Sequence, residues 1–169
     1  MPRIAFLACP DTLPGSPTRR ADAFEHDLLL AALREGLGAR GEVRDIDWRS
    51  PLDQLTGFDL AYLGTPWDYT EAKDEFLERL EALAAAGVTV CNPVAVIRWN
   101  SDKLYLRELE QRGAASIPTL WPESAGPQDL LAAFDHFGCE RVVVKRRVGA
   151  GAVGQDSFSR EGPPPPGWF

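Results

Sequence analysis

The chain has 169 residues, of which 44% are hydrophobic and 25% charged, values typical of a globular protein and unlike those of a disordered chain or a coiled rod. Its 25 acidic residues outnumber its 18 basic residues and give a formal net charge of -7. This balance argues against a nucleic-acid partner, whose binding needs many basic residues along phosphates. A small anion can still bind where a few basic side chains converge, because net charge does not fix the charge of one pocket.

The chain has few cysteines and histidines, the residues that form disulfides and hold transition metals. The three cysteines lie far apart at Cys9, Cys91 and Cys139, which indicates neither a disulfide framework nor a C-x-x-C site and favours a cytoplasmic protein. Two histidines cannot form a histidine cage, so Mg2+ held by oxygen ligands is the only metal we consider. The first apolar run, residues 4–9, is far shorter than the ~20 residues of a membrane-spanning helix, and we expect no membrane contact.

Apolar runs and amphipathic segments alternate over residues 1–95. The run at 4–8 is apolar throughout, which predicts a strand buried on both faces, whereas residues 43–48 alternate as in a half-exposed edge strand. In the first helix, the spacing of Phe24 and Leu28 predicts the face that packs on the core. We expect an α/β domain with an open, mostly parallel sheet and flanking helices. The predicted strands are residues 4–8, 43–48, 58–63 and 88–91, and the predicted helices are residues 20–39 and 70–86.

A second unit is predicted over residues 96–160, and residues 161–169 form a proline-rich tail whose four consecutive prolines favour polyproline II. The first helix of this unit is expected to have Asn100 or Ser101 as its N-cap and Lys103 in its first turn. The predicted elements are helices at 102–112 and 127–137 and strands at 117–121, 141–145 and 155–159.

Residues 149–154 match G-x-G-x-x-G, the letters of a dinucleotide-binding turn. That turn leads directly into a helix, whereas strands are predicted on both sides here, so we interpret the segment as a glycine-rich hairpin. Gly149, Gly151 and Gly154 can then fold over phosphates and present backbone N–H groups to them. The alternative is a flexible hairpin with no ligand.

Two lysines stand near this hairpin. Lys145 ends the strand before the glycines, and Lys103 opens the helix at 102–112. Both ammonium groups are suited to neutralising phosphate oxygens, and Arg146 and Arg147 would extend the positive patch. The alternative is that these lysines are solvated surface residues.

The segment after the predicted strand at 58–63 lies at the carboxyl end of a strand, where open α/β sheets bind ligands. Its residues Thr65, Trp67, Asp68 and Tyr69 are candidate substrate-binding residues, and Asn100 is placed to line the same cleft. The alternative is a structural turn in which the rings pack on a neighbour and Asp68 caps the next helix.

Short motifs follow one another at residues 65–69, 76–80, 92–93, 99–106, 113, 118–119 and 143–145. In this order and spacing they resemble the ATP-grasp superfamily, specifically ligases of the cycloserine-biosynthesis, glutathione-synthetase and RimK types. The resemblance implies a pre-ATP-grasp α/β domain followed by the start of an α+β ATP-grasp subdomain. It also implies that Lys103 and Lys145 contact ATP phosphates and that the glycine loop closes over them.

The function implied by the resemblance is ATP-dependent ligation of a small-molecule carboxylate to an amine or related nucleophile through an acyl phosphate, with ATP and Mg2+ as cofactors. The family's Mg2+ ligands belong to a second subdomain, so we assign no metal ligand within this chain. We interpret the chain as the N-terminal part of such a ligase, contributing half of the ATP site and part of the substrate site. Arg146 departs from the proline common in the family at that position. A homodimer is compatible with the sequence.

The main alternative is a non-catalytic α/β module that binds a small ligand or a protein, with the tail at 163–169 docking in an aromatic groove. A complete enzyme built on the first domain alone lacks a nucleophile and base, because the chain contains no G-x-S-x-G motif and no cysteine with a histidine signature.

The purified chain is expected to bind ATP weakly or not at all and to release no ADP, because phosphoryl transfer depends on metal ions that bridge the phosphate oxygens, and the sequence supplies no cluster to hold them. A coupled ADP assay with Mg2+ and candidate amino acids checks this. Robust ADP release that disappears in a Lys103→Ala, Lys145→Ala double variant would contradict it.

Overall fold

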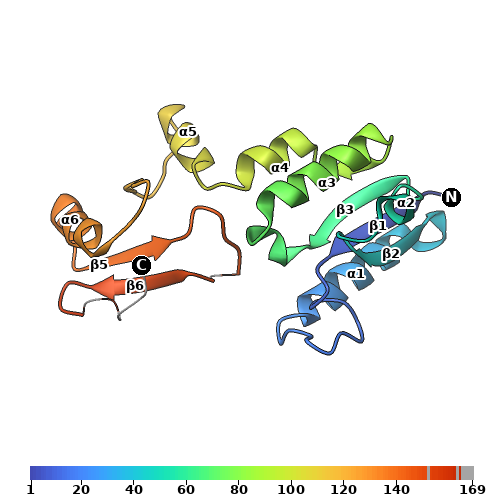
Figure 1. Cartoon of the computed structure of the whole chain (residues 1–169), viewed down its shortest axis with the longest axis horizontal. Helices are drawn as coiled ribbons and strands as arrows, with labels where there is room; N and C mark the ends of the chain where they lie inside the picture. The colour runs from blue at the N-terminus through green and yellow to red at the C-terminus, as the bar shows by residue number, and fades with distance from the viewer. Residues whose placement is uncertain (152, 163, 165–169) are drawn as a thin grey trace. The chain divides into compact units, whose positions relative to one another are not determined.

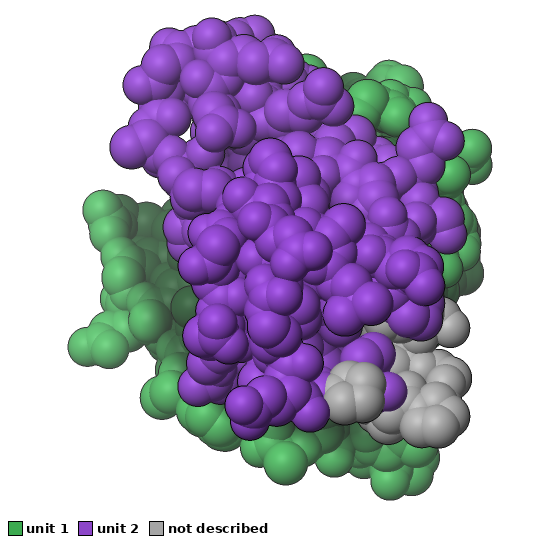
Figure 2. Space-filling model, turned by 90° about the vertical axis from the view of Figure 1, so that its left-hand side faces the viewer, with its two compact units in different colours: residues 1–101 green, residues 102–169 purple. Residues whose placement is uncertain are grey.

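The computed structural model describes residues 1–151, 153–162 and 164, and the chain divides into two compact units, Met1–Ser101 and Asp102–Phe169 (Figure 2). The first unit contains β1 (Arg3–Ala8), α1 (Phe24–Leu37), η1 (Gly38–Arg40), β2 (Glu42–Asp47), α2 (Leu52–Leu55), β3 (Leu60–Thr65), η2 (Trp67–Thr70), α3 (Lys73–Ala85), β4 (Thr89–Cys91) and α4 (Val94–Asn100). The second contains α5 (Tyr105–Gln111), α6 (Pro127–Phe137), β5 (Arg141–Lys145) and β6 (Gln155–Ser159).

A four-stranded parallel sheet with the order β2-β1-β3-β4 forms the core of the first unit. The apolar strand β1 lies inside the sheet and is buried from Ile4 to Ala8, whereas β2 lies at an edge and alternates between buried and more exposed residues. Both positions agree with the predictions from hydrophobic patterning. The predicted α/β class with an open parallel sheet is therefore confirmed.

Helices cover both faces of this sheet (Figure 1). Successive residues of a strand point to opposite sides, so β1 contributes side chains to the core on each face. Phe6 of β1 packs with Leu30 of α1 on one face. Leu7 packs with Leu77 and Leu80 of α3 on the other face. Two short helices, α2 and α4, join the second face; the sequence does not predict them, since neither is long enough to show a helical apolar period.

The face of α1 that packs on the sheet differs from the prediction. Phe24 and Leu28, which the apolar spacing assigns to the core, are 57% and 65% exposed, whereas His26 and Leu30 are buried. The His26 ring lies 5.1 Å from that of Phe6, and its Nδ1 is 2.8 Å from the hydroxyl of Thr65. The buried face of α1 thus includes a hydrogen-bonded histidine, which a prediction based on apolar residues alone does not include.

The second unit contains an antiparallel hairpin, β5–β6, with α6 packed on one face through Leu130, Phe134 and Phe158. The predicted helix at 127–137 and the strands at 141–145 and 155–159 are confirmed. The predicted strand at 117–121 is wrong: this segment is in neither a helix nor a strand, and Ile117 is 84% exposed. Its composition favours extended backbone, but a strand also needs a hydrogen-bonded neighbour. Of the proline-rich run 163–166, only Pro164 belongs to the described residues.

None of the helices in the described residues combines the length and apolar character that crossing a membrane requires.

Gly64 in β3 marks a close approach between the strand and the Phe6 ring of β1. A Cβ at position 64 would overlap three ring atoms of Phe6, which is itself fully buried. We expect Gly64→Ala to destabilise the first unit by about 1–3 kcal/mol, as overpacking of a well-packed core does. Urea or thermal denaturation measures this.

Gly36 provides the matched control, since it lies in α1 and a Cβ there would meet no atom within 4 Å. Gly36→Ala should stabilise the protein by about 0.5–1 kcal/mol, the helix-propensity difference between the two residues. Equal effects of the two substitutions would show that the contact with Phe6 does not limit residue 64.

Candidate functional site

Thr65 ends β3 and joins the loops that follow two neighbouring strands. Its side chain is fully buried, and its Oγ1 lies 2.8 Å from His26 Nδ1 and 3.0 Å from Thr12 Oγ1. Thr12 belongs to the loop after β1 and is also fully buried. The hydroxyl of Thr65, predicted as a substrate contact, therefore bonds to the interior of the first unit in this structure.

Asp68 in η2 is likewise occupied by protein partners. One carboxylate oxygen accepts a hydrogen bond of 2.7 Å from Trp48 Nε1, and the other pairs with the guanidinium of Arg49. The same guanidinium lies 4.0 Å from the centre of the Trp48 ring, a cation–π arrangement. Asp68 thus fixes η2 to the end of β2, and no spacing signal along the chain pairs it with Trp48 or Arg49.

The remaining candidate residues of the first unit border one cavity of about 230 Å³, and Trp67, Tyr69 and Asn100 all line it. Burial raises the pKa of Tyr69, so this phenol stays neutral over the physiological range. The guanidinium of Arg20 lies 5.2 Å from the Trp67 ring centre and is held by both carboxylate oxygens of Asp22, at 2.8 Å each. The other lining residues are Leu63, Gly64, Pro66, Phe76, Ile97 and Ser101.

This cavity is mainly apolar and aromatic, with polar groups from Asn100 and Ser101 at its border. Pockets of this composition bind small molecules by enclosing an apolar part and orienting a polar one. The structure thus brings together three of the five residues that the sequence proposed for substrate binding, while Thr65 and Asp68 support the loop between them.

In the second unit, Lys103 lies against the glycine hairpin. Its Nζ donates a hydrogen bond of 2.9 Å to the carbonyl of Gly149 and is 3.5 Å from that of Arg147. Burial lowers the pKa of Lys103, and the positive charge of Lys145 lowers it further. The charges of these two ammonium groups, which come from distant parts of the sequence, oppose each other, and an anion bound to both would relieve the repulsion.

Arg147 has a partner that the sequence did not reveal. Its Nε and Nη2 bond to the two carboxylate oxygens of Asp102 at 3.1 and 2.5 Å. Asp102 also accepts a hydrogen bond of 3.0 Å from the backbone N–H of Leu104. Arg147, which was predicted to extend the positive patch, therefore has its charge compensated by Asp102.

The helix predicted at 102–112 begins later, at Tyr105, and residues 102–104 form a turn. Asn100 is instead the last residue of α4, Ser101 is the C-cap of that helix, and Leu104 is the N-cap of α5. The turn is stabilised locally by the Asp102 side chain, which competes with helix formation. Lys103 therefore precedes the helix and does not lie in its first turn.

The glycines lie in the segment that joins β5 to β6, and the interpretation as a hairpin is confirmed in place of a Rossmann turn. Gly151 and Gly154 have φ angles of 59° and 65°, which favour glycine. The Arg146 side chain lies across Gly154, with Cδ 2.7 Å from the position that a Cβ would take. Ala152 lies outside the described residues.

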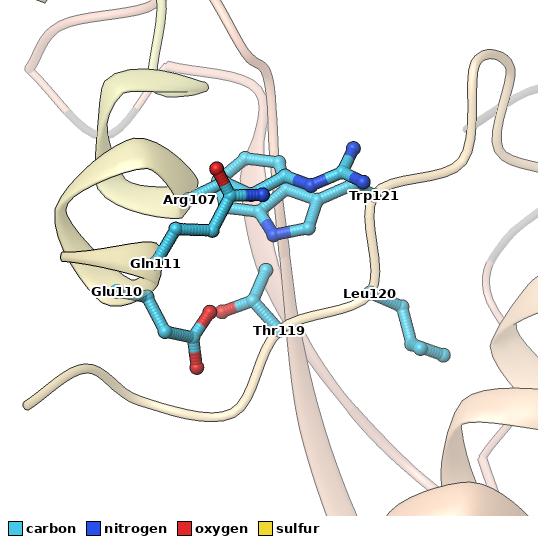
Figure 3. Close-up of a pocket in the computed structure, with 6 residues that line it drawn as sticks. All are labelled: Arg107, Glu110, Gln111, Thr119, Leu120 and Trp121. Atoms are coloured by element: carbon cyan, nitrogen blue, oxygen red, sulfur yellow. The ribbon is translucent and has the colours of Figure 1, made fainter. Parts of the chain in front are cut away.

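Within the described ranges, no three or more histidine, cysteine, aspartate or glutamate side chains come together as a metal site would require. A second, open hollow of about 450 Å³ lies in the second unit, and none of the predicted site residues lines it. Figure 3 shows its residues, which are Arg107, Glu110 and Gln111 on α5 and Thr119, Leu120 and Trp121 on the extended segment.

The first unit is an α/β domain with an open parallel sheet, and the second carries a hairpin with α6 packed against it, the fold class that the sequence motifs implied. A family described as the N-terminal domain of D-cycloserine synthetase DcsG matches residues 4–92, more than half of the chain. The chain therefore belongs to the family of D-cycloserine synthetase N-terminal domains.

Two relatives agree with this assignment. The cycloserine biosynthesis protein DcsG of Streptomyces lavendulae is 32% identical over 109 residues, which are 64% of this chain and 34% of that protein. The crystal structure of D-cycloserine synthetase DcsG covers 94% of this chain and 51% of its own, with a TM-score of 0.73 and 24% identity, a likeness that shows the fold. The chain thus spans about a third of the curated relative and about half of the solved one.

The closeness of the two lysines predicts a measurable coupling of their charges. Replacing Lys145 by alanine removes a like charge, so the pKa of Lys103 should rise, although burial will still hold it below the usual value. A pH titration of the lysine side chains by NMR measures this. Lys73→Ala in α3 is the control and should leave Lys103 unchanged. A Lys103 pKa that stays constant or falls in Lys145→Ala would show that the two charges do not interact.

Proposed function

We propose that this chain forms part of an ATP-dependent carboxylate–amine ligase, in which its second unit binds phosphate groups and its first unit binds part of a small-molecule substrate. The observation that carries the proposal is the pair of lysines, Lys103 and Lys145, beside the glycine hairpin. Membership of the D-cycloserine synthetase family supports a synthetase that acts on small molecules.

The residues present fit a phosphate group. Lys103 is partly desolvated, and the like charge of Lys145 makes its protonated form less favourable. A negative ligand would interact favourably with both ammonium groups. The hydrogen bonds of Lys103 in this structure run to the neutral carbonyls of Gly149 and Arg147. A phosphate oxygen is a stronger acceptor than a carbonyl and would replace them at low cost.

ATP, when bound, would supply the phosphoryl group that activates the substrate carboxylate as an acyl phosphate. The role of this chain is to hold and neutralise the phosphates through Lys103 and Lys145, with backbone N–H groups of the Gly149, Gly151 and Gly154 loop nearby. The described residues do not come together as a Mg2+ site, so we assign no step of the reaction to a metal held by this chain.

The cavity of the first unit is proposed to bind part of the substrate. Trp67 and Tyr69 supply apolar walls, and the amide of Asn100 supplies a donor and an acceptor that suit a carboxylate or an amine. Thr65 and Asp68 act on this site indirectly, since their own polar atoms are bonded to His26, Thr12, Trp48 and Arg49.

A second candidate function, that of a non-catalytic module for a small ligand, has the same cavity in its favour. It predicts ligand binding by the first unit without any involvement of the lysines. The two candidates therefore differ in the response of Lys103 and Lys145 to ATP.

The chain contains only three lysines, Lys73, Lys103 and Lys145, which makes amine labelling a direct test. With ATP in large excess, acetylation of Lys103 and Lys145 should slow severalfold while that of Lys73 in α3 is unchanged, because bound phosphates shield and protonate the two amines. Mass spectrometry of the three peptides measures the rates.

Tripolyphosphate serves as a probe of the phosphate contacts alone, and adenosine is the matched ligand without phosphates. Protection by both ATP and tripolyphosphate, but not by adenosine, is the expected pattern. Equal labelling of all three lysines with and without ATP would refute the proposed phosphate site and favour the non-catalytic module.

A further inference from the structure

We propose that Asp102 and Arg147 are a positioning pair that holds the Lys103 turn against the end of β5 and thereby keeps the ammonium groups of Lys103 and Lys145 at one anion site. The inference rests on the proposed function, since it concerns how that phosphate site is assembled. Neither member of the pair is itself proposed to contact phosphate.

The contacts between the two segments converge on Arg147. Its side chain donates to both carboxylate oxygens of Asp102, at 3.1 Å from Nε and 2.5 Å from Nη2. Its backbone carbonyl accepts a hydrogen bond of 3.0 Å from the backbone N–H of Lys103. A planar guanidinium that bonds a carboxylate through two parallel N–H groups fixes orientation as well as distance.

Residues 102–104 form a turn outside any helix or strand, so contacts with other segments must fix its position. Residue Asp102 is bonded at once to Arg147 and to the N–H of Leu104, so the same carboxylate shapes the turn and attaches it to the hairpin. Arg147 lies two residues after Lys145, and Asp102 directly precedes Lys103. Each member of the pair is thus close to one lysine in the sequence, and their bond brings the two lysines together.

The pair also offsets the repulsion between the lysines. The charge of Lys145 lowers the pKa of Lys103, whereas the carboxylate of Asp102 raises it. The exposed fraction of the Asp102 side chain is 21%, against 46% for Arg147, so the carboxylate is the more shielded partner. Removing this carboxylate would leave the repulsion between the two ammonium groups without that compensation.

Cross-linking measures the positions of the two lysines directly. A short bifunctional amine reagent should join Lys103 to Lys145 in the wild-type chain, and single modification of Lys73 gives the reagent dose. Asp102→Asn and Arg147→Gln should each lower the yield of this cross-link severalfold. Arg147→Lys retains the charge without the planar fork and should give an intermediate yield.

Arg160→Gln is the matched control, because it removes a surface ion pair of the same unit, with Asp135 at 2.8 Å, that joins no lysine segment. It should leave the cross-link unchanged. Amide hydrogen exchange of β5 and β6 should also stay protected in all variants. Unchanged cross-linking in Asp102→Asn and Arg147→Gln would overturn the proposal, and so would loss of hairpin protection, since the pair would then be needed for folding of the unit.

A further arm separates this inference from the proposed function. ATP or tripolyphosphate should reduce cross-linking of the wild-type chain by covering both amines. If the variants lose the cross-link but neither polyphosphate affects the wild type, the pair positions the lysines and the phosphate site fails. If polyphosphate protects the wild type and the variants keep the full cross-link, the phosphate site stands and the positioning role fails.

Discussion

The parallel pairing of β1 with β3 is the constraint on which the first unit depends. Parallel strands end at the same edge of a sheet, so the loops that follow β1 and β3 begin side by side. The backbone N–H of Cys9 bonds to the carbonyl of Thr65 at 3.0 Å, and the hydroxyls of Thr12 and Thr65 meet at the same distance. Buried hydroxyls must be hydrogen-bonded to avoid a desolvation cost, and His26 completes the group. Trp67 and Tyr69 therefore follow a strand end whose buried hydroxyls are hydrogen-bonded.

In the second unit, the proposed phosphate site depends on contacts that hold the Lys103 turn against the end of β5. Its hairpin is small, with a core of Leu130, Phe134 and Phe158, and one strand ends at Lys145. The turn that carries Lys103 reaches the same strand end through contacts with Arg147 and Gly149. The charge of Lys145 lowers the pKa of Lys103, and a ligand of opposite charge at the proposed site would relieve this repulsion.

Family membership and the phosphate-site proposal rest on different parts of the chain. The family match covers residues 4–92, all within the first unit, whereas both lysines and the glycine hairpin belong to the second. The solved relative extends the likeness of fold to 94% of the chain. The family match thus concerns the first unit, whereas the proposed phosphate contacts belong to the second, and both are consistent with the proposed ATP-dependent ligase.

Hydrophobic patterning indicated the α/β class, the interior place of β1 and the edge place of β2, because these depend on which residues avoid water. The glycine-rich segment between two predicted strands indicated the hairpin of β5 and β6. The order and spacing of the sequence motifs also indicated Lys103 and Lys145 as phosphate contacts, and their role in binding stays a prediction. Only the tertiary structure decided that His26 replaces Phe24 on the buried face of α1 and that residues 117–121 form no strand. It also decided that Asp68 and Arg147 are taken by Trp48, Arg49 and Asp102. The physical reason is the same in each case: the partner that a side chain or strand needs lies far away in the sequence, and its spacing along the chain leaves no periodic signal.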